Sequence, residues 1–369
     1  MRTFRGVIPA QAGICVNAGF RNQACTRPDR VSGMTIRLSL EDFRVHFCLI
    51  LFIIFAAVAS IGCIAGNAMA SESAAETVAF VRQGNIWVAR VDGTGERRLT
   101  DFGVCGGPAL SPDGKQVAFH CRGDQDIYPD TGFGQIYLVE TAGGEPRRMK
   151  YNGILAAEHP AFSPDGKSLV FVGLSEVRKQ GKEDEAQVFA TMSISIADIQ
   201  TGKTQAVLRH KNAMLDAGYI YSKPAFSPDG QWILWQQSGS DVSGGFAMTD
   251  LKGKTLFRFP QKGEDPMPYW GPSLALDGQT VLCYSPATSD AADDTIYVVD
   301  RRTGKMVEVI TGASPAFVRN GTAIVFERWD NRWSDKASSN LWILELKPGA
   351  APRRIITDAS APAGAMLRK

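Results

Sequence analysis

The sequence predicts an all-β fold, a six-bladed β-propeller of four-stranded antiparallel blades that a C-terminal strand closes. Three observations predict it. A seven-residue motif that begins with proline and contains a turn recurs along the chain, starting at residues 108, 160, 224, 272 and 315. Further strand-like runs follow each copy, and the incomplete units at the two ends of the repeat region add up to one more unit.

The first element of each unit is a hairpin. Its motif reads PALSPDG at 108–114, PAFSPDG at 160–166 and 224–230, PSLALDG at 272–278 and PAFVRNG at 315–321. The runs that follow are rich in β-branched and aromatic residues: KQVAFH, KSLVFV, QWILWQ, QTVLCY and TAIVFE. Proline presets φ and glycine accepts positive φ, so the motif should form the turn between strands one and two. We expect Asp113, Asp165 and Asp229 to cap these turns rather than to act as catalytic carboxylates.

The third and fourth strands follow after a connection of variable length. They read QIYLVETAGGEPRRM, SISIADIQTGKTQAVL, FAMTDLKGKTLFRF, TIYVVDRRTGKMVEVI and LWILELKPGAAPRRI, each with a polar turn in its middle. In an up-and-down blade, the turns joining strands one to two and three to four emerge at one end, and all other connections emerge at the other. We therefore expect short turns on one side of the ring and long loops on the opposite side.

The two ends of the repeat region complement each other. Residues 77–100 match the last three strands of a unit, and residues 361–367 resemble a lone first strand. An open solenoid would leave its terminal units uncapped, so complementary ends favour a closed ring. We predict that the segment from Pro362 to Leu367 is the innermost strand of the blade formed by 77–100, and that residues 71–369 are one domain.

The N-terminal part predicts a leader over residues 1–70. An apolar run at 47–66 follows Arg37 and Arg44 and precedes Ala68-Met69-Ala70, which is typical of a bacterial secretory signal over residues 34–70. We expect cleavage before Ser71, export to the periplasm, and a doubtful extension at 1–33 with translation beginning at Met34. Two alternatives remain open: a retained membrane anchor, and lipidation of Cys63 at a partial lipoprotein box.

Charge excludes one class of partner. The chain carries 40 Lys and Arg against 38 Asp and Glu, a formal net charge of +2. A protein that binds nucleic acid through phosphates usually has a strongly basic surface, so we expect no nucleic-acid partner. We expect contact with a membrane only through the N-terminal segment, if that segment is retained or lipidated.

The repeat unit PAFSPDGK…IYLVE…GG…RRM resembles the TolB-type (PD40-type) propeller repeat over residues 77–367. This resemblance implies a six-bladed propeller. TolB has an additional α/β domain before its propeller, and we expect none between Ser71 and Thr77. The repeat also resembles the propellers of prolyl-oligopeptidase-type peptidases, whose nucleophile lies in a separate domain. The G-x-S-x-G motif of such a nucleophile occurs nowhere in this sequence, so a serine hydrolase is not predicted.

Three histidines follow the leader: His120, His159 and His210. The blade pattern places all three toward the loop side of the ring. Some pectate-degrading lyases resemble this propeller and bind a metal through rim histidines, which makes a carbohydrate-active lyase or hydrolase the alternative function. Histidines on separate loops are more often unrelated surface residues, so we assign no catalytic residue, no metal and no cofactor.

The long loops are the predicted binding surface, at 122–134, 173–190, 210–223, 260–271 and 328–340. They carry aromatic residues of the kinds that anchor interfaces and stack on sugars: Tyr128, Tyr219, Tyr221, Tyr269, Trp270, Trp329 and Trp333. We expect a non-catalytic module of the cell envelope that binds an envelope protein or an extended ligand such as a glycan. A structural envelope component with no discrete ligand is the remaining alternative.

Cysteine spacing predicts one disulfide. Cys105 and Cys121 are equally far from Asp113 at the hairpin turn, so they should face each other across two antiparallel strands. An exported compartment favours their oxidation. Cys283, in the run VLCY, is left unpaired and is expected to be a buried apolar residue.

Overall fold

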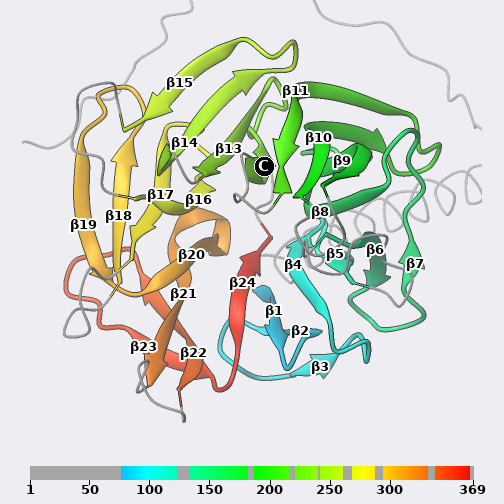
Figure 1. Ribbon diagram of the computed structural model, residues 1–369. Helices are drawn as coiled ribbons and strands as arrows, with labels where there is room; N and C mark the ends of the chain where they lie inside the picture. The colour runs from blue at the N-terminus through cyan, green and yellow to red at the C-terminus, as the bar shows by residue number, and fades with distance from the viewer. Residues whose placement is uncertain are drawn as a thin grey trace, which may run out of the picture. The chain divides into compact units, whose positions relative to one another are not determined.

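The computed structural model describes residues 76–122, 133–181, 187–215, 221–239, 242–260, 268–286, 294–330 and 337–365. Within them the chain forms six separate four-stranded antiparallel sheets, arranged around a common centre (Figure 1). The predicted six-bladed propeller is therefore confirmed. The predicted leader over residues 1–70 lies outside the described residues, and the division into leader and propeller domain stays a prediction.

Each blade is named by its order along the ring. Blade 1 contains β24 (Ser360–Gly364), β1 (Thr77–Arg82), β2 (Asn85–Arg90) and β3 (Arg97–Arg98). Blade 2 contains β4 (Cys105–Leu110), β5 (Gln116–Cys121), β6 (Gln135–Glu140) and β7 (Arg147–Arg148). Blade 3 contains β8 (Ala156–Phe162), β9 (Ser168–Gln180), β10 (Gln187–Asp198) and β11 (Thr204–Met214).

The remaining blades follow the same order from the inside outward. Blade 4 contains β12 (Tyr221–Phe226), β13 (Trp232–Gly239), β14 (Val242–Asp250) and β15 (Thr255–Phe259). Blade 5 contains β16 (Trp270–Leu274), β17 (Thr280–Ser285), β18 (Thr295–Asp300) and β19 (Met306–Thr311). Blade 6 contains β20 (Ala313–Val318), β21 (Ala323–Asp330), β22 (Ser338–Glu345) and β23 (Arg353–Ile356), with a short 3-10 turn at Arg319–Gly321.

The ring closes through β24, as the complementary ends of the repeat region predicted. This strand is antiparallel to β1, with Val78 opposite Gly364 and Ala79 opposite Ala363. It also contacts the innermost strands of both neighbouring blades, β4 and β20. The first blade is thus completed by residues from the far end of the described chain (Figure 1).

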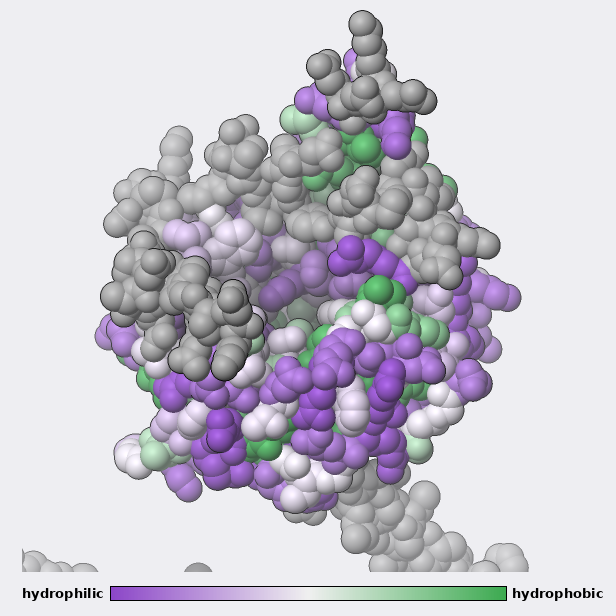
Figure 2. All heavy atoms as spheres, turned by 60° about the horizontal axis from the view of Figure 1, so that its bottom comes forward, coloured by the Kyte–Doolittle hydropathy of each residue, from purple (hydrophilic) through white to green (hydrophobic). Residues whose placement is uncertain are grey.

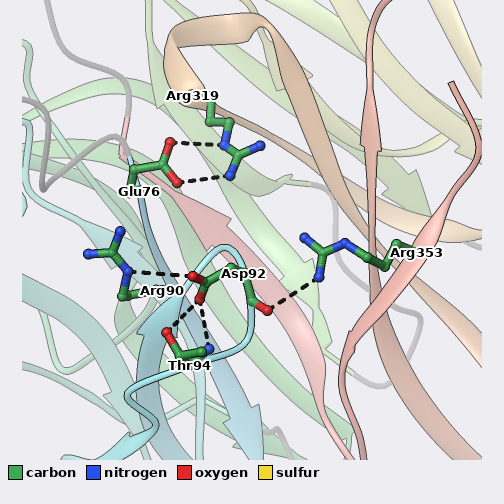
Figure 3. Close-up of polar contacts among 6 residues, drawn as sticks. All are labelled: Glu76, Arg90, Asp92, Thr94, Arg319 and Arg353. Carbon is green, nitrogen blue, oxygen red and sulfur yellow. Dashed lines mark hydrogen bonds and ion pairs between the residues drawn. The ribbon is translucent and has the colours of Figure 1, made fainter.

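Polar contacts reinforce the junction between blades 1 and 6 (Figure 3). The Arg319 guanidinium donates from Nε and Nη2 to the two carboxylate oxygens of Glu76, at 2.9 and 3.0 Å, and from Nη1 to Glu345. The Arg353 side chain donates to the backbone carbonyl of Asp92 at 3.3 Å. Arg319 and Arg353 belong to blade 6, whereas Glu76 and Asp92 flank strands of blade 1. The contacts to these two residues therefore join the blades at the side of the ring where the short turns emerge.

Blade 3 departs from the sequence prediction. The stretches 173–190 and 210–223 were expected to be loops, but β9 continues to Gln180, β10 begins at Gln187 and β11 continues to Met214. About half of the residues in these extensions are polar and exposed, and backbone pairing between β9, β10 and β11 satisfies their N–H and C=O groups. The expectation of loops was wrong here because hydrophobic alternation marks only strands with a buried face.

The repeated aspartates cap the hairpin turns, as predicted. Asp113 accepts hydrogen bonds from the Ser111 hydroxyl at 2.6 Å and from the Lys115 backbone N–H at 3.1 Å. The same pair of contacts recurs at Asp165 and at Asp229. These carboxylates are therefore occupied by their own turns.

Acidification should weaken these turns. The hydroxyl of Ser163 and the Lys167 N–H hold the pKa of Asp165 below its ordinary value of 3.8. A carboxylate whose pKa is lower in the folded state stabilises the fold above its unfolded pKa, and that stabilisation is lost as the pH falls through the folded value. We expect Asp165→Asn to lower the urea midpoint at pH 7 and to reduce the further loss between pH 7 and pH 3. Ser163→Ala should act in the same direction, and an unchanged pH dependence in both variants would contradict the assignment.

Each innermost strand has a β-bulge directly before a proline. The residue before that proline has a left-handed φ between 46 and 59° in every blade. The six residues are Gly107, His159, Lys223, Gly271, Ser314 and Ala361. At each of them the pairing register with the adjacent strand shifts. A bulge redirects the residue that it contains, and all six line the centre of the ring.

Among the described residues, no helix is long and apolar enough to cross a membrane.

Candidate functional site

A cavity of about 320 Å³ lies at the centre of the ring, lined by the innermost strand of every blade. Its walls are mostly proline and alanine side chains from the repeated Pro-Ala motifs, including Pro108, Pro160, Pro224 and Pro362. Prolines suit these strands because the inner edge faces the cavity and needs no further donor. The repeat that builds the blades thus also makes the cavity apolar.

Two of the described residues that line this cavity have ionisable side chains, Lys223 and His159, and both come from bulge positions. A Cβ placed on Gly271 would lie 3.6 Å from the Lys223 Nζ and 2.9 Å from the Tyr284 ring. Lys223 therefore reaches from blade 4 toward blade 5, over a position where only glycine fits. Burial lowers the pKa of Lys223, and the negative charge of Glu327 opposes that shift.

Polar side chains at the ends of three second strands hold the bulges of the following blades. The Gln236 Oε1 accepts the Gly271 N–H at 2.8 Å, and the Glu327 Oε1 accepts the Ala361 N–H at 2.8 Å. In the same way, the His120 Nδ1 accepts the His159 N–H at 3.4 Å. Each contact joins one blade to the next, and it occurs at every other junction of the ring.

Sequence reasoning missed this set of acceptors, although the signal was present. The five second-strand runs end in His, Val, Gln, Tyr and Glu when they are aligned on the turn. A polar residue at the end of an otherwise apolar strand requires a buried partner. That requirement could have pointed to a contact across the blade junction.

Glu327 is the buried carboxylate of this ring of acceptors. It is 6% exposed, and its Oε2 accepts a hydrogen bond from the Ser339 hydroxyl at 3.1 Å. Together with the Ala361 N–H, this gives each carboxylate oxygen a donor. A buried carboxylate that is bonded in this way serves the blade junction rather than general acid or base chemistry.

The structure brings together two of the three predicted rim histidines. The rings of His120 and His159 are 5.4 Å apart in an edge-to-face arrangement, and the His159 Nδ1 lies 3.2 Å from the Glu158 Oε1. Burial lowers the pKa of His120 to about 3, with smaller contributions from His159 and Arg122. The neutral ring can therefore accept the His159 N–H.

His210 lies apart from this pair, exposed on β11, the outermost strand of blade 3. In the described part of the chain, no group of three or more His, Cys, Asp or Glu residues is placed to hold a metal ion.

The aromatic residues predicted to form the binding rim differ in how far they are exposed to solvent. Trp329 is 42% exposed at the end of β21, and Trp270 is half-buried at the start of β16, against Gly244. Tyr221 and Tyr269 pack in the core, where Tyr221 meets the Trp235 ring at 5.2 Å. The other three predicted residues lie outside the described residues: Tyr128, Tyr219 and Trp333. Of the described aromatics in this set, Trp270 and Trp329 present surface to a partner.

The remaining described surface offers no wide apolar area on the face drawn in Figure 2. That face is mostly hydrophilic, and its apolar areas are small and scattered. The apolar lining of the central cavity and the tryptophans at the loop side are candidate contacts for a ligand or partner.

Comparison with known proteins agrees with this architecture. Residues 72–274 match the family model described as "TolB beta propeller domain". The crystal structure of TolB from Acinetobacter baumannii superposes with a TM-score of 0.58 at 18% identity, covering 80% of this chain and 67% of that one. A likeness at this identity concerns the fold.

Curated relatives are similar over part of their length. The uncharacterized peptidase YuxL of Bacillus subtilis is 28% identical over 181 residues, which are 41% of this chain and 24% of that protein. The uncharacterized protein Atu1656 of Agrobacterium fabrum is 30% identical over 154 residues, or 39% of this chain and 45% of that protein. The chain thus spans less than half the length of these relatives.

Proposed function

The chain belongs to the family of TolB β-propeller domains, and on this premise we propose that it is an exported, non-catalytic binding protein of the bacterial cell envelope. One observation carries the proposal. The tryptophans that present surface lie at the side of the ring where the connections between strands two and three and between blades emerge, whereas the opposite side has short capped turns. Recognition by propellers and other rigid scaffolds commonly uses the longer loops of one face.

Two features support export: a disulfide bond and the predicted leader. The disulfide between Cys105 and Cys121 is the kind of bond that persists in oxidising compartments such as the periplasm. The apolar run at residues 47–66 and the small residues before Ser71 are typical of a secretory signal. Periplasmic location is part of the proposal, and lipidation at Cys63 or a retained anchor are outcomes that mass spectrometry of the mature protein would distinguish.

The polar side chains at the blade junctions favour binding over catalysis. His120 is neutral and already accepts a backbone hydrogen bond, and Glu327 has a donor at each oxygen. The lyase alternative needs a metal ion, so metal that is retained after dialysis against a chelator would favour that alternative.

Capture of an envelope partner tests the proposal. We expect Trp270→Ala combined with Trp329→Ala to reduce recovery of the partner from solubilised envelope proteins at least tenfold, because exposed tryptophans commonly dominate interface energies. The measurement is a pull-down with the purified protein, quantified by mass spectrometry. The single variant Trp329→Ala should change the melting temperature little, since Trp329 is 42% exposed.

The matched control changes the opposite side of the ring. Lys167→Glu combined with Lys203→Glu reverses two exposed charges in the short turns of blade 3, and we expect recovery of the partner to be unchanged. If the lysine variant loses the partner while the tryptophan variant retains it, the binding surface lies on the short-turn side.

A further inference from the structure

The innermost strand of blade 4 holds a lysine where the fold does not require one. Lys223 occupies a left-handed backbone position with φ 46°, which an L side chain with a Cβ rarely adopts. Two of the equivalent bulge residues, Gly107 and Gly271, are glycine, which adopts this conformation freely. The backbone therefore favours glycine at Lys223, and the long cationic side chain points to another role.

The surroundings of Lys223 do not compensate its charge fully. Proline and alanine side chains form most of the cavity walls, and burial lowers the pKa of the amine. Its charged neighbour is Glu327, whose two oxygens already accept hydrogen bonds from the Ala361 N–H and the Ser339 hydroxyl. In the described part of the chain, no hydrogen bond from the Lys223 Nζ is present. An ammonium that faces a mostly apolar cavity without such a bond gains from any acceptor that enters the cavity.

We propose that the central cavity binds a small organic acid or a peptide end through its carboxylate, with the Lys223 ammonium as the group that recognises it. A carboxylate supplies the acceptor and the opposite charge together, and a charge-assisted hydrogen bond is about twice as strong as a neutral one. The apolar walls accommodate a short apolar body behind the carboxylate. A cavity of about 320 Å³ is at the small end of the range for ligand sites.

This proposal goes beyond capture of an envelope partner and does not depend on it. The tryptophans lie toward the loops outside the cavity, whereas Lys223 lies inside it. Loss of partner capture would leave carboxylate binding unaffected, and failure of carboxylate binding would leave partner capture unaffected.

Calorimetry with matched probes tests the proposal on the purified full chain. The probes are pentanoate and pentanamide, which have the same apolar body and differ in charge. A second pair is the tripeptide Gly-Ala-Val with a free or an amidated C-terminus. We expect at least one carboxylate probe to bind at least ten times more tightly than its matched amide. The carboxylate probe with the higher affinity shows whether a free acid or a peptide end is preferred. Equal affinity within both pairs would overturn the proposal.

A substitution then assigns the preference to one side chain. Lys223→Met keeps an unbranched apolar side chain without the terminal ammonium, and it should abolish the preference for the carboxylate. The control variant Lys203→Met removes an exposed charge at a turn of blade 3 and should keep the preference. Retention of the preference in a folded Lys223→Met protein would contradict the role of Lys223, and the comparison on the wild-type chain stands whether or not that variant folds.

Discussion

Deletion of residues 359–369 should lower the free energy of unfolding by several kcal/mol. This would be a large fraction of the roughly 5–15 kcal/mol that stabilises an ordinary domain. The truncation removes the whole of β24, so β1 loses its ladder on one side while β4 and β20 lose a packing neighbour. Burial of apolar area and backbone hydrogen bonds are lost together.

The deletion also leaves a buried charge with one donor fewer. The Ala361 N–H bonds the Glu327 Oε1, and Glu327 is 6% exposed. Removing a partner from a buried carboxylate costs more than the hydrogen bond alone contributes, because the charge remains desolvated. We therefore expect destabilisation to reach blade 6 as well as blade 1.

Urea unfolding followed by circular dichroism measures this effect. The matched control deletes only residues 366–369, which leaves β24 intact, and its midpoint should equal that of the full chain. If the longer deletion has the same midpoint and slope as the control, β24 contributes nothing to the ring and closure by this strand is wrong.

Replacement of both Cys105 and Cys121 by alanine should cost about 3 kcal/mol, the chain-entropy value for a loop of this length. The two residues are bonded with a sequence separation of 16, and they are opposite one another on β4 and β5. The disulfide constrains the unfolded chain in this region and so raises the relative stability of the folded state. The predicted pairing is confirmed, and Cys283 is free and buried.

Unfolding of the oxidised protein with and without reductant checks the same effect without a substitution. Reduction should shift the urea midpoint of the wild-type chain and leave that of the double variant unchanged. A thiol titration of the unfolded protein should find two fewer thiols before reduction than after it. If the titration finds equal numbers of thiols before and after reduction, the disulfide is absent and does not contribute to stability.

The architecture could be predicted because its signal is repeated. Each SPDG-type motif fixes a turn, and the run after it fixes a strand. The incomplete units at 77–100 and 361–367 indicated how the ring closes. Patterns of this kind depend on local chemistry, namely φ preferences at Pro and Gly and side-chain alternation in strands, so one sequence is enough to read them.

The site was harder to predict from the sequence, because it depends on which blades become neighbours in the ring. The contact from Gln236 to the Gly271 N–H, and the approach of Lys223 toward Gly271, join residues of different blades. Local patterns could not separate the core residue Tyr221 from the exposed Trp329, since both are aromatics near strand ends. Burial depends on packing in three dimensions, and strand-end residues receive no periodic signal that reports it.

Ring closure by β24 also affects how the protein is made. A ribosome delivers the chain from the N-terminus, at about 5–20 residues per second. Strands β1, β2 and β3 of blade 1 therefore lack β24, their innermost strand, until the rest of the propeller has been synthesised. During this interval the inner edge of β1 is unpaired, and an unpaired edge can be occupied by a strand of another chain. The order of synthesis thus makes the first blade the last to be completed.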